Sequence, residues 1–223
     1  MARNKKLMGL AGVASACGLA LAISSAPANA TAYLRVCDIT TGTCNNQSGA
    51  DASPLSYVGP LGDWNLTVAV GSSPGSQSLP QLDLTFGAQS IGRAMQDQQL
   101  EIVYYIDDAI GAGNLTFLTT VGGTDSPGAS GTYLSATQQG TFNPLSQFSS
   151  SSASFNFSGL ATQDLVGSYD LGMIVDLFDL KGTVGGVTGD MNIRVPEPGT
   201  IALFGAALLG CALFLRRRRL PNV

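Results

Sequence analysis

The stretch Ser168-Tyr169-Asp170-Leu171-Gly172-Met173-Ile174-Val175-Asp176-Leu177 is the clearest guide to the fold of this chain. Every second residue is large and apolar, namely Tyr169, Leu171, Met173, Val175 and Leu177. Small or charged residues stand between most of them, namely Ser168, Asp170, Gly172 and Asp176. Because side chains of a β-strand point alternately to opposite faces, one face of this stretch is predicted to be buried and the other to meet water. The stretch therefore predicts a strand of an antiparallel sheet that is covered on one side.

The same alternation recurs along the chain, whereas helical periodicity does not. Apolar residues alternate at Leu66, Val68 and Val70; Leu82, Leu84 and Phe86; Ile102, Tyr104 and Ile106; Leu115, Phe117 and Thr119; Phe155 and Phe157; and Met191, Ile193 and Val195. Clusters of Gly, Ser, Pro and Asn separate these segments, and the serine-rich run 146–154 is predicted to be a loop. About eight to ten short strands predict an all-β fold, a single antiparallel β-sandwich of the jelly-roll or Ig-like kind.

The N-terminus has the three parts of a secretory signal peptide. Arg3, Lys5 and Lys6 precede an apolar run over residues 7–23, and a small-residue segment ends in Ala28-Asn29-Ala30. A positive start, an apolar middle and an Ala-x-Ala site predict cleavage after Ala30. The chain is therefore predicted to be exported by the general secretion machinery and cut by signal peptidase.

The C-terminal tail has the length and charge of a short membrane span. Residues 199–215 contain no charged side chain, and Arg216, Arg217, Arg218 and Arg219 follow directly. A helix of this length is at the lower limit for a hydrocarbon core of about 30 Å, and a terminal arginine cluster favours the cytoplasmic side. Pro196 and Pro198 flank Glu197 and hold the preceding segment extended. The tail thus predicts a transmembrane helix that stops translocation.

The order of these parts resembles a known sorting signal. Val195-Pro196-Glu197-Pro198, an apolar helix and a terminal arginine cluster resemble the PEP-CTERM signal of Gram-negative bacteria, the substrate tail of exosortases. The resemblance implies that an exosortase, a membrane-embedded cysteine transpeptidase, recognises Pro196, Glu197 and Pro198 and removes the hydrophobic tail. The alternative is an ordinary tail anchor with a proline-rich stalk.

These features divide the chain into four parts: a signal peptide at 1–30, an exported β-sandwich domain at 31–194, a sorting signal at 195–219 and a short tail at 220–223. With an export signal at one end and cytoplasmic arginines at the other, the domain is predicted to lie on the periplasmic side of the inner membrane. After processing it would reach the cell surface or the extracellular matrix.

The charge of the exported part argues against a nucleic-acid partner. It keeps four basic residues against all 15 acidic residues of the chain, so its net charge is near −11. Such a surface repels phosphate backbones.

Cys37 and Cys44 are the two cysteines of the exported part, and they are close in sequence. In an oxidising compartment this pair predicts a local disulfide, which stabilises by about 2 to 2.5 kcal/mol. A metal site at this pair is the disfavoured alternative, because the chain contains no histidine and too few thiolates.

The lack of histidine also excludes Ser-His-Asp and Cys-His catalysis. A glycosidase needs only two carboxylates, and Glu101, Asp107, Asp108, Asp176 and Asp179 could supply them. Such residues are more often solvated strand ends, so we expect no catalytic residues and no cofactor. Calcium bound by clustered aspartates is the alternative kept open.

Trp64 and Tyr57 are the sequence-based candidates for a sugar-stacking platform, although a lone Trp in an alternating strand is more often a core residue. We therefore expect a non-enzymatic surface or extracellular-matrix protein of the exopolysaccharide or biofilm type, with an exopolysaccharide as a further partner. A carbohydrate-binding module or carbohydrate-active enzyme with the same tail is one alternative. An uncleaved, tail-anchored periplasmic protein is the other.

Overall fold

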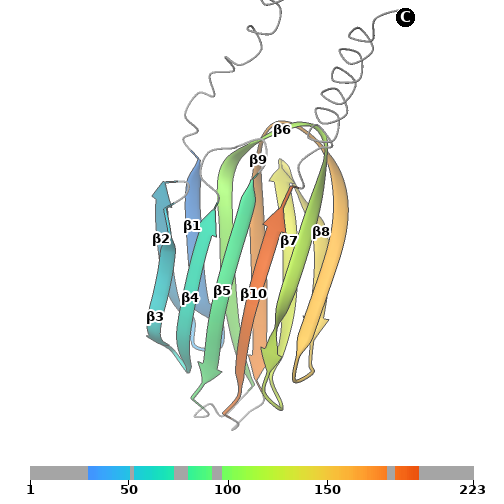
Figure 1. Ribbon diagram of the computed structural model, residues 1–223. Coiled ribbons are helices and arrows are strands. Elements are labelled where there is room, and N and C mark those ends of the chain that lie inside the picture. The colour runs from blue at the N-terminus through green and yellow to red at the C-terminus, as the bar shows by residue number, and fades with distance from the viewer. Residues whose placement is uncertain (1–29, 51–52, 73–79, 92–96, 180–183, 196–223) are drawn as a thin grey trace, which may run out of the picture.

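The computed structural model describes residues 30–50, 53–72, 80–91, 97–179 and 184–195 of the 223-residue chain. These described residues form ten strands and no helix (Figure 1). The strands are β1 (Thr31–Asp38), β2 (Thr43–Ala50), β3 (Leu55–Leu61), β4 (Trp64–Ser72), β5 (Gln81–Ser90), β6 (Gln98–Asp125), β7 (Ser130–Gln139), β8 (Thr141–Ser150), β9 (Phe155–Asp179) and β10 (Gly186–Arg194). The predicted signal peptide up to residue 29 and the predicted tail from Pro196 onward lie outside the described residues. In the part that is described, we find no helix with the length and apolar character needed to cross a membrane.

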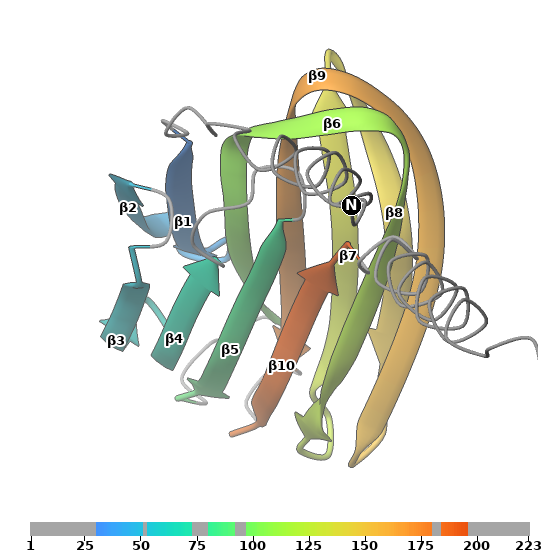
Figure 2. The ribbon, with the colours of Figure 1, turned by 45° about the horizontal axis from the view of Figure 1, so that its top comes forward.

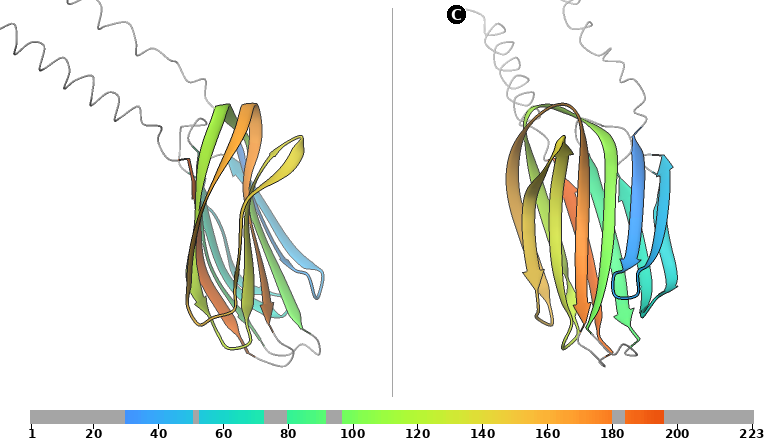
Figure 3. Two further views of the ribbon diagram at one scale, coloured as in Figure 1. Left: turned by 90° about the vertical axis from the view of Figure 1, so that its right-hand side faces the viewer. Right: turned by 180° about the vertical axis from the view of Figure 1, so that it is seen from behind.

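The two long strands β6 and β9 form the frame of the fold. They pair antiparallel from Gln98 opposite Asp179 to Gly123 opposite Phe155, and they bend together over one end of the molecule (Figures 2 and 3). The ladder is irregular between Ile106 and Ala109, where Asp108 has a positive φ of 54°. Because of this bend, each long strand belongs to two layers.

The remaining strands extend the two layers, and every pairing is antiparallel. In one layer the order is β3, β4, β5 and β10, followed by the second half of β6 and the first half of β9. In the other it is β2, β1, the first half of β6, the second half of β9, β7 and β8. The protein is therefore an antiparallel β-sandwich, as the alternation predicted.

Two details differ from the sequence prediction. The alternating segments at residues 102–106 and 115–119 are parts of one strand, β6, because the irregular ladder at Asp107 and Asp108 turns the strand without ending it. The serine-rich run predicted as a loop begins inside β8, whose backbone pairs with β7. Pairing with a neighbouring strand thus overrides the low strand propensity of serine.

The core lies between the layers and consists of the apolar residues that occupy every second position of the strands. Tyr169, Leu171, Met173, Val175 and Leu177 are each at most 2% exposed, as predicted. Trp64 is 1% exposed and lies in this core with Leu66 and Val68. The stacking hypothesis for Trp64 is therefore wrong, because a buried indole offers no face to a sugar.

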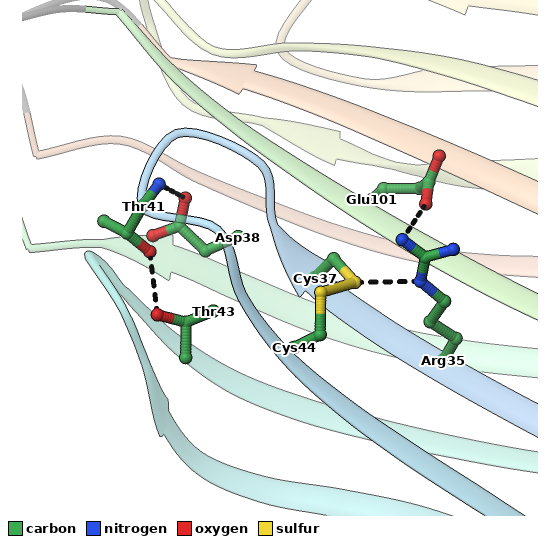
Figure 4. Close-up of a disulfide and its surroundings, with 7 residues drawn as sticks. All are labelled: Arg35, Cys37, Asp38, Thr41, Thr43, Cys44 and Glu101. Atoms are coloured by element: carbon green, nitrogen blue, oxygen red, sulfur yellow. Dashed lines mark hydrogen bonds and ion pairs between the residues drawn. A yellow bond between two sulfur atoms is a disulfide. The ribbon is translucent and has the colours of Figure 1, made fainter.

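The predicted disulfide is present between β1 and β2 (Figure 4). Cys37 and Cys44 stand opposite each other in the ladder, with Cα atoms 4.1 Å apart. The Arg35 side chain covers the bridge, since its Nε donates to Cys37 Sγ at 2.9 Å and its guanidinium lies 3.9 Å from the Glu101 carboxylate. No residue of β2 belongs to the buried core, so the disulfide attaches a polar edge strand to the sandwich.

Candidate functional site

The sandwich determines where the predicted sorting tail leaves the domain. Val195 is 8% exposed, and its N–H donates to the Pro80 carbonyl at 3.4 Å. Arg194, the last residue of β10, is paired with β5 on one side and with β6 on the other. Of the predicted motif, Pro196, Glu197 and Pro198 lie outside the described residues, as do Arg216 to Arg219. The motif therefore begins directly at the end of a central strand, without a linker.

The start of β1 lies at the same end of the sandwich as the end of β10 (Figure 1). Ala30 is 4% exposed, whereas Ala28 of the predicted cleavage site lies outside the described residues. The Thr31 N–H donates to Asp107 Oδ1, and the Tyr33 hydroxyl donates to Asp107 Oδ2 at 3.3 Å. Asp107 thus ties the first residue after the predicted cleavage site to the bend of β6.

The outer faces of the two layers differ in chemistry. On the β4, β5 and β10 side, the lining of a hollow includes Thr67, Thr124 and Thr188, and Thr124 and Thr188 hydrogen-bond to each other at 2.8 Å. The hollow of about 450 Å³ on this face contains no aromatic side chain. On the β6, β9 and β7 side, a cavity of about 350 Å³ is lined by aromatic, aliphatic and polar residues. The second face is therefore the better candidate for ligand binding.

We call this cavity the Tyr105 groove, and its lining residues are Val103, Tyr105, Ala136, Thr137, Gln138, Phe142, Asp170, Gly172, Met173 and Ile174. Strand register explains its shape. Tyr105 of β6 stands opposite Gly172 of β9, which stands opposite Ala136 of β7. Because Gly172 and Ala136 carry little or no side chain, the row is low beside the Tyr105 ring. A Cβ on Gly172 would come within 3.0 Å of the Tyr105 Cβ, so glycine fits this row best.

Aromatic side chains flank the groove. The Tyr105 ring stacks on Tyr33 of β1, with ring centroids 4.7 Å apart and planes inclined by 12°. Phe142, which is 51% exposed, is the second residue of β8 and lies on the far side. One flank is thus an aromatic stack that holds its orientation, and the other is a solvent-accessible ring.

The two ends of the groove have different chemistry. In one neighbouring row, Val103 stands opposite Ile174. In the other, Asp170 stands opposite Gln138. Successive rows on one face of a sheet are about 7 Å apart. The groove therefore offers apolar contact at one end and hydrogen-bonding groups at the other.

Three carboxylates make the Asp170 end of the groove strongly negative. Burial raises the pKa of Asp170, and the nearby charges of Asp107 and Asp108 raise it further, while the Asp108 backbone N–H lowers it. The pKa of Tyr105 is raised by burial and by neighbouring Tyr33, Asp170 and Asp107. This field disfavours anionic ligands. Among the described residues, no three carboxylate or thiolate groups cluster as a metal ion would require.

The carboxylates considered for catalysis lie at three places along the β6–β9 ladder: Asp107 and Asp108 at the bend, Glu101 and Asp176 as a facing pair, and Asp179 at the end of β9. Glu101 stands opposite Asp176 on the same face as the groove, one row beyond Val103 and Ile174. Burial raises the pKa of Asp176, and the Glu101 charge adds to this. Asp179 is 1% exposed and accepts hydrogen bonds from the Gly185 N–H and the Ser90 hydroxyl. Asp179 therefore connects the end of β9 to Gly185, directly before β10, and to Ser90 at the end of β5.

The sequence analysis missed the groove and named Tyr57 and Trp64 instead. Tyr57 lies on β3 in the other layer, where its hydroxyl donates to the Pro60 carbonyl at 2.6 Å. A signal for the groove was nevertheless present in the sequence. Val103, Tyr105 and Ile174 are large apolar or aromatic residues in the outward phase of their strands, where water-facing residues are expected.

Comparison with known proteins identifies the tail. The model of the PEP-CTERM protein-sorting motif matches residues 194–219, so the chain carries this motif from the last residue of β10. The motif implies export and membrane-anchored sorting in Gram-negative bacteria, with an exosortase as the processing partner. No curated protein matches the chain.

Several solved structures are similar at low identity. TmCBM61 in complex with beta-1,4-galactotriose has a TM-score of 0.34 at 10% identity and covers 62% of this chain and 92% of its own. The structure of infectious bursal disease virus strain Gx has a TM-score of 0.32 at 10% identity and covers 80% of this chain and 54% of its own. The Arthrobacter globiformis T6 isomalto-dextranase complexed with panose has a TM-score of 0.25 at 10% identity and covers 71% of this chain and 29% of its own. With TM-scores below 0.5, none of the three bears on the function of this chain.

Proposed function

We propose that this protein is a non-enzymatic component of the cell surface or the extracellular matrix, retained at the inner membrane by its tail and then released by an exosortase. Its partners before release are the general secretion machinery, signal peptidase and the inner membrane. After release, the β-sandwich serves a structural or adhesive role within an exopolysaccharide or biofilm matrix.

The observation that supports this proposal best is the position of the sorting motif. The match begins at Arg194, which is hydrogen-bonded inside the sheet, and Val195 is buried. Unless the end of β10 opens, a processing enzyme can reach the backbone of the tail only beyond Val195. Folding of the sandwich therefore protects the end of β10 up to Val195, which supports processing within the tail that follows.

The surroundings of two candidate carboxylates support a role without catalysis. Asp179 is used in a structural hydrogen-bond network, and Glu101 is close to Arg35. A carbohydrate-active enzyme with the same tail is the competing proposal. Turnover of a polysaccharide that disappears in Glu101→Gln would favour the enzyme.

The deciding experiment is the intact mass of the protein isolated from cells with and without the exosortase. In the presence of the enzyme, we expect a chain that begins at Thr31 and lacks Leu213 and all later residues. In its absence, the chain should begin at Thr31 and retain the tail. The triple variant Pro196→Ala, Glu197→Ala, Pro198→Ala should retain the tail in both strains.

A control variant separates motif recognition from general effects on export. Asp190→Asn changes a charge on β10 outside the motif and should be processed like the natural chain. An identical, tail-bearing mass in both strains would instead establish an uncleaved tail anchor.

A further inference from the structure

The Tyr105 groove has a defined shape and a defined set of lining side chains, which the sorting function does not explain. Its low floor at Gly172 and Ala136 follows from the register of three strands that are far apart in the sequence. Tyr105 and Phe142 flank this floor, and Asp170 and Gln138 close one end. An aromatic flank, a small-residue floor and a polar end together fit a ligand with a flat apolar face and hydrogen-bonding groups at its edge.

Charge excludes one group of ligands. Asp170, Asp107 and Asp108 repel one another's charge at one end of the groove, and the exported part carries a net charge near −11. Anionic polysaccharides, nucleic acids and acidic peptides would add to this repulsion. The ligand must therefore be uncharged or positive.

Strand pairing excludes a second group. A peptide that adds to a sheet needs an edge strand with free backbone groups. At the groove, β6 is paired with β1 and β9, and β9 is paired with β6 and β7. β7 in turn is paired with β9 and β8. Recognition in this groove must therefore come from side chains.

The polar end excludes a third group. A purely apolar ligand, such as an acyl chain, would cover the Asp170 carboxylate and the Gln138 amide without offering them hydrogen bonds. Covering such groups without hydrogen-bond partners is unfavourable. A ligand with donors and acceptors spaced along its rim avoids this cost.

We propose that the Tyr105 groove binds an uncharged saccharide unit, whose C–H face lies against the Tyr105 ring while adjacent hydroxyl groups bond to Asp170 and Gln138. The carboxyl oxygens of Asp170 accept from two hydroxyl groups, and the Gln138 amide both donates and accepts. Phe142 covers the opposite side of the sugar ring. The volume of about 350 Å³ lies near the lower end for small-molecule sites, so the groove accommodates a short section of a neutral chain.

The test is a binding assay on the full chain purified in a detergent without a sugar headgroup, because a maltoside would compete for the groove. The probes are neutral oligosaccharides of glucose, galactose and mannose on an array, followed by calorimetry with the best binder. We expect at least one neutral probe to bind. The Tyr105→Ala variant should bind it with an affinity that is lower by about tenfold or more. Tyr105→Phe keeps the ring and should stay within about threefold of the natural chain.

Two further variants test the polar end and the position of the site. Asp170→Asn removes the charge but keeps the shape, and we expect an affinity about tenfold lower, because hydrogen bonds to a charged group are stronger than neutral ones. Tyr57→Ala removes a partly buried tyrosine from the other layer and is the matched control, which should bind like the natural chain. A melting temperature within a few degrees of the natural protein establishes that each variant is folded.

Three results would overturn the proposal. In the first, a folded Tyr105→Ala variant still binds the neutral glycan as the natural chain does. In the second, the protein binds lysine-rich peptides but no neutral glycan. In the third, none of the neutral probes binds at millimolar concentration. The sorting proposal stands or falls separately, because the mass experiment measures processing whether or not the groove binds sugar.

Discussion

Reduction of the Cys37–Cys44 disulfide is expected to destabilise the sandwich measurably. The bridge joins β1, which is paired with β6 in the second layer, to β2, which pairs with β1 alone. β2 contributes no residue to the buried core, so its own packing adds little to its attachment. The cross-link and the backbone ladder with β1 therefore hold β2 in place.

The expected magnitude follows from the loop that the bridge closes. Cys37 and Cys44 are seven residues apart, and the chain-entropy model assigns about 2.5 kcal/mol to a loop of this size. A domain of this length loses about 2 to 4 °C of melting temperature per kcal/mol. Complete reduction should therefore lower the melting temperature by about 5 to 10 °C.

The assay compares thermal melts of the oxidised and the reduced protein by circular dichroism at one pH. The double variant Cys37→Ala, Cys44→Ala is the control, since a reductant should leave its melting temperature unchanged. Limited proteolysis should cut the reduced protein first within residues 43–50. If oxidised and reduced protein melt together, or if the reductant also shifts the double variant, the stabilising role assigned to the bridge is wrong.

Three further outcomes are expected. Asp38 is fully buried and accepts from the Thr41 and Asp63 N–H groups at 3.1 and 2.8 Å, so Asp38→Ala should lower the free energy of unfolding by about 2 to 3 kcal/mol in urea melts, and Asp38→Asn should cost less. Cleavage before Thr31 turns its N–H, which lies beside Asp107, into an ammonium group. Asp107→Asn should therefore lower the free energy of unfolding by about 1 kcal/mol more in a chain that begins at Thr31 than in one that retains Ala30. Equal losses in urea melts of the two chains would contradict this. Burial raises the pKa of Asp125 and Asp176 in the folded protein above the ordinary value of 3.8. The protonated carboxyl groups therefore stabilise the fold fully below pH 3.8, and this contribution is lost as the pH rises through the raised pKa. The melting temperature should increase on acidification from about pH 7 towards 4, and it should increase less in Asp176→Asn.

The fold class could be predicted because strand alternation is a local property. Tyr169, Leu171 and Met173 alternate with smaller or polar residues, and the backbone of a strand sends them to one side whatever their partner is. The core position of Trp64 follows from its phase with Leu66 and Val68, and this default interpretation is confirmed, while the sugar-stacking alternative is wrong. The disulfide was equally local, since the cysteines are only seven positions apart.

Strand ends and edges were harder to predict. The continuity of β6 through Asp107 and Asp108 depends on its long ladder with β9, which supplies hydrogen-bond partners on both sides of the bend. β2 and β8 carry mostly polar residues, and their positions are set by pairing with β1 and β7. No pattern within either segment reveals that partner.

The sequence by itself determined the sorting motif, the alternating strands and the local disulfide, because each depends on residues that are neighbours along the chain. Only the tertiary structure decided that Tyr105, Gly172 and Ala136 form one row with a low floor, and that Asp170 and Gln138 close its end. The physical reason is register: these residues come from three strands separated by tens of positions, and a shift of one residue in any ladder would turn the groove residues of that strand toward the core.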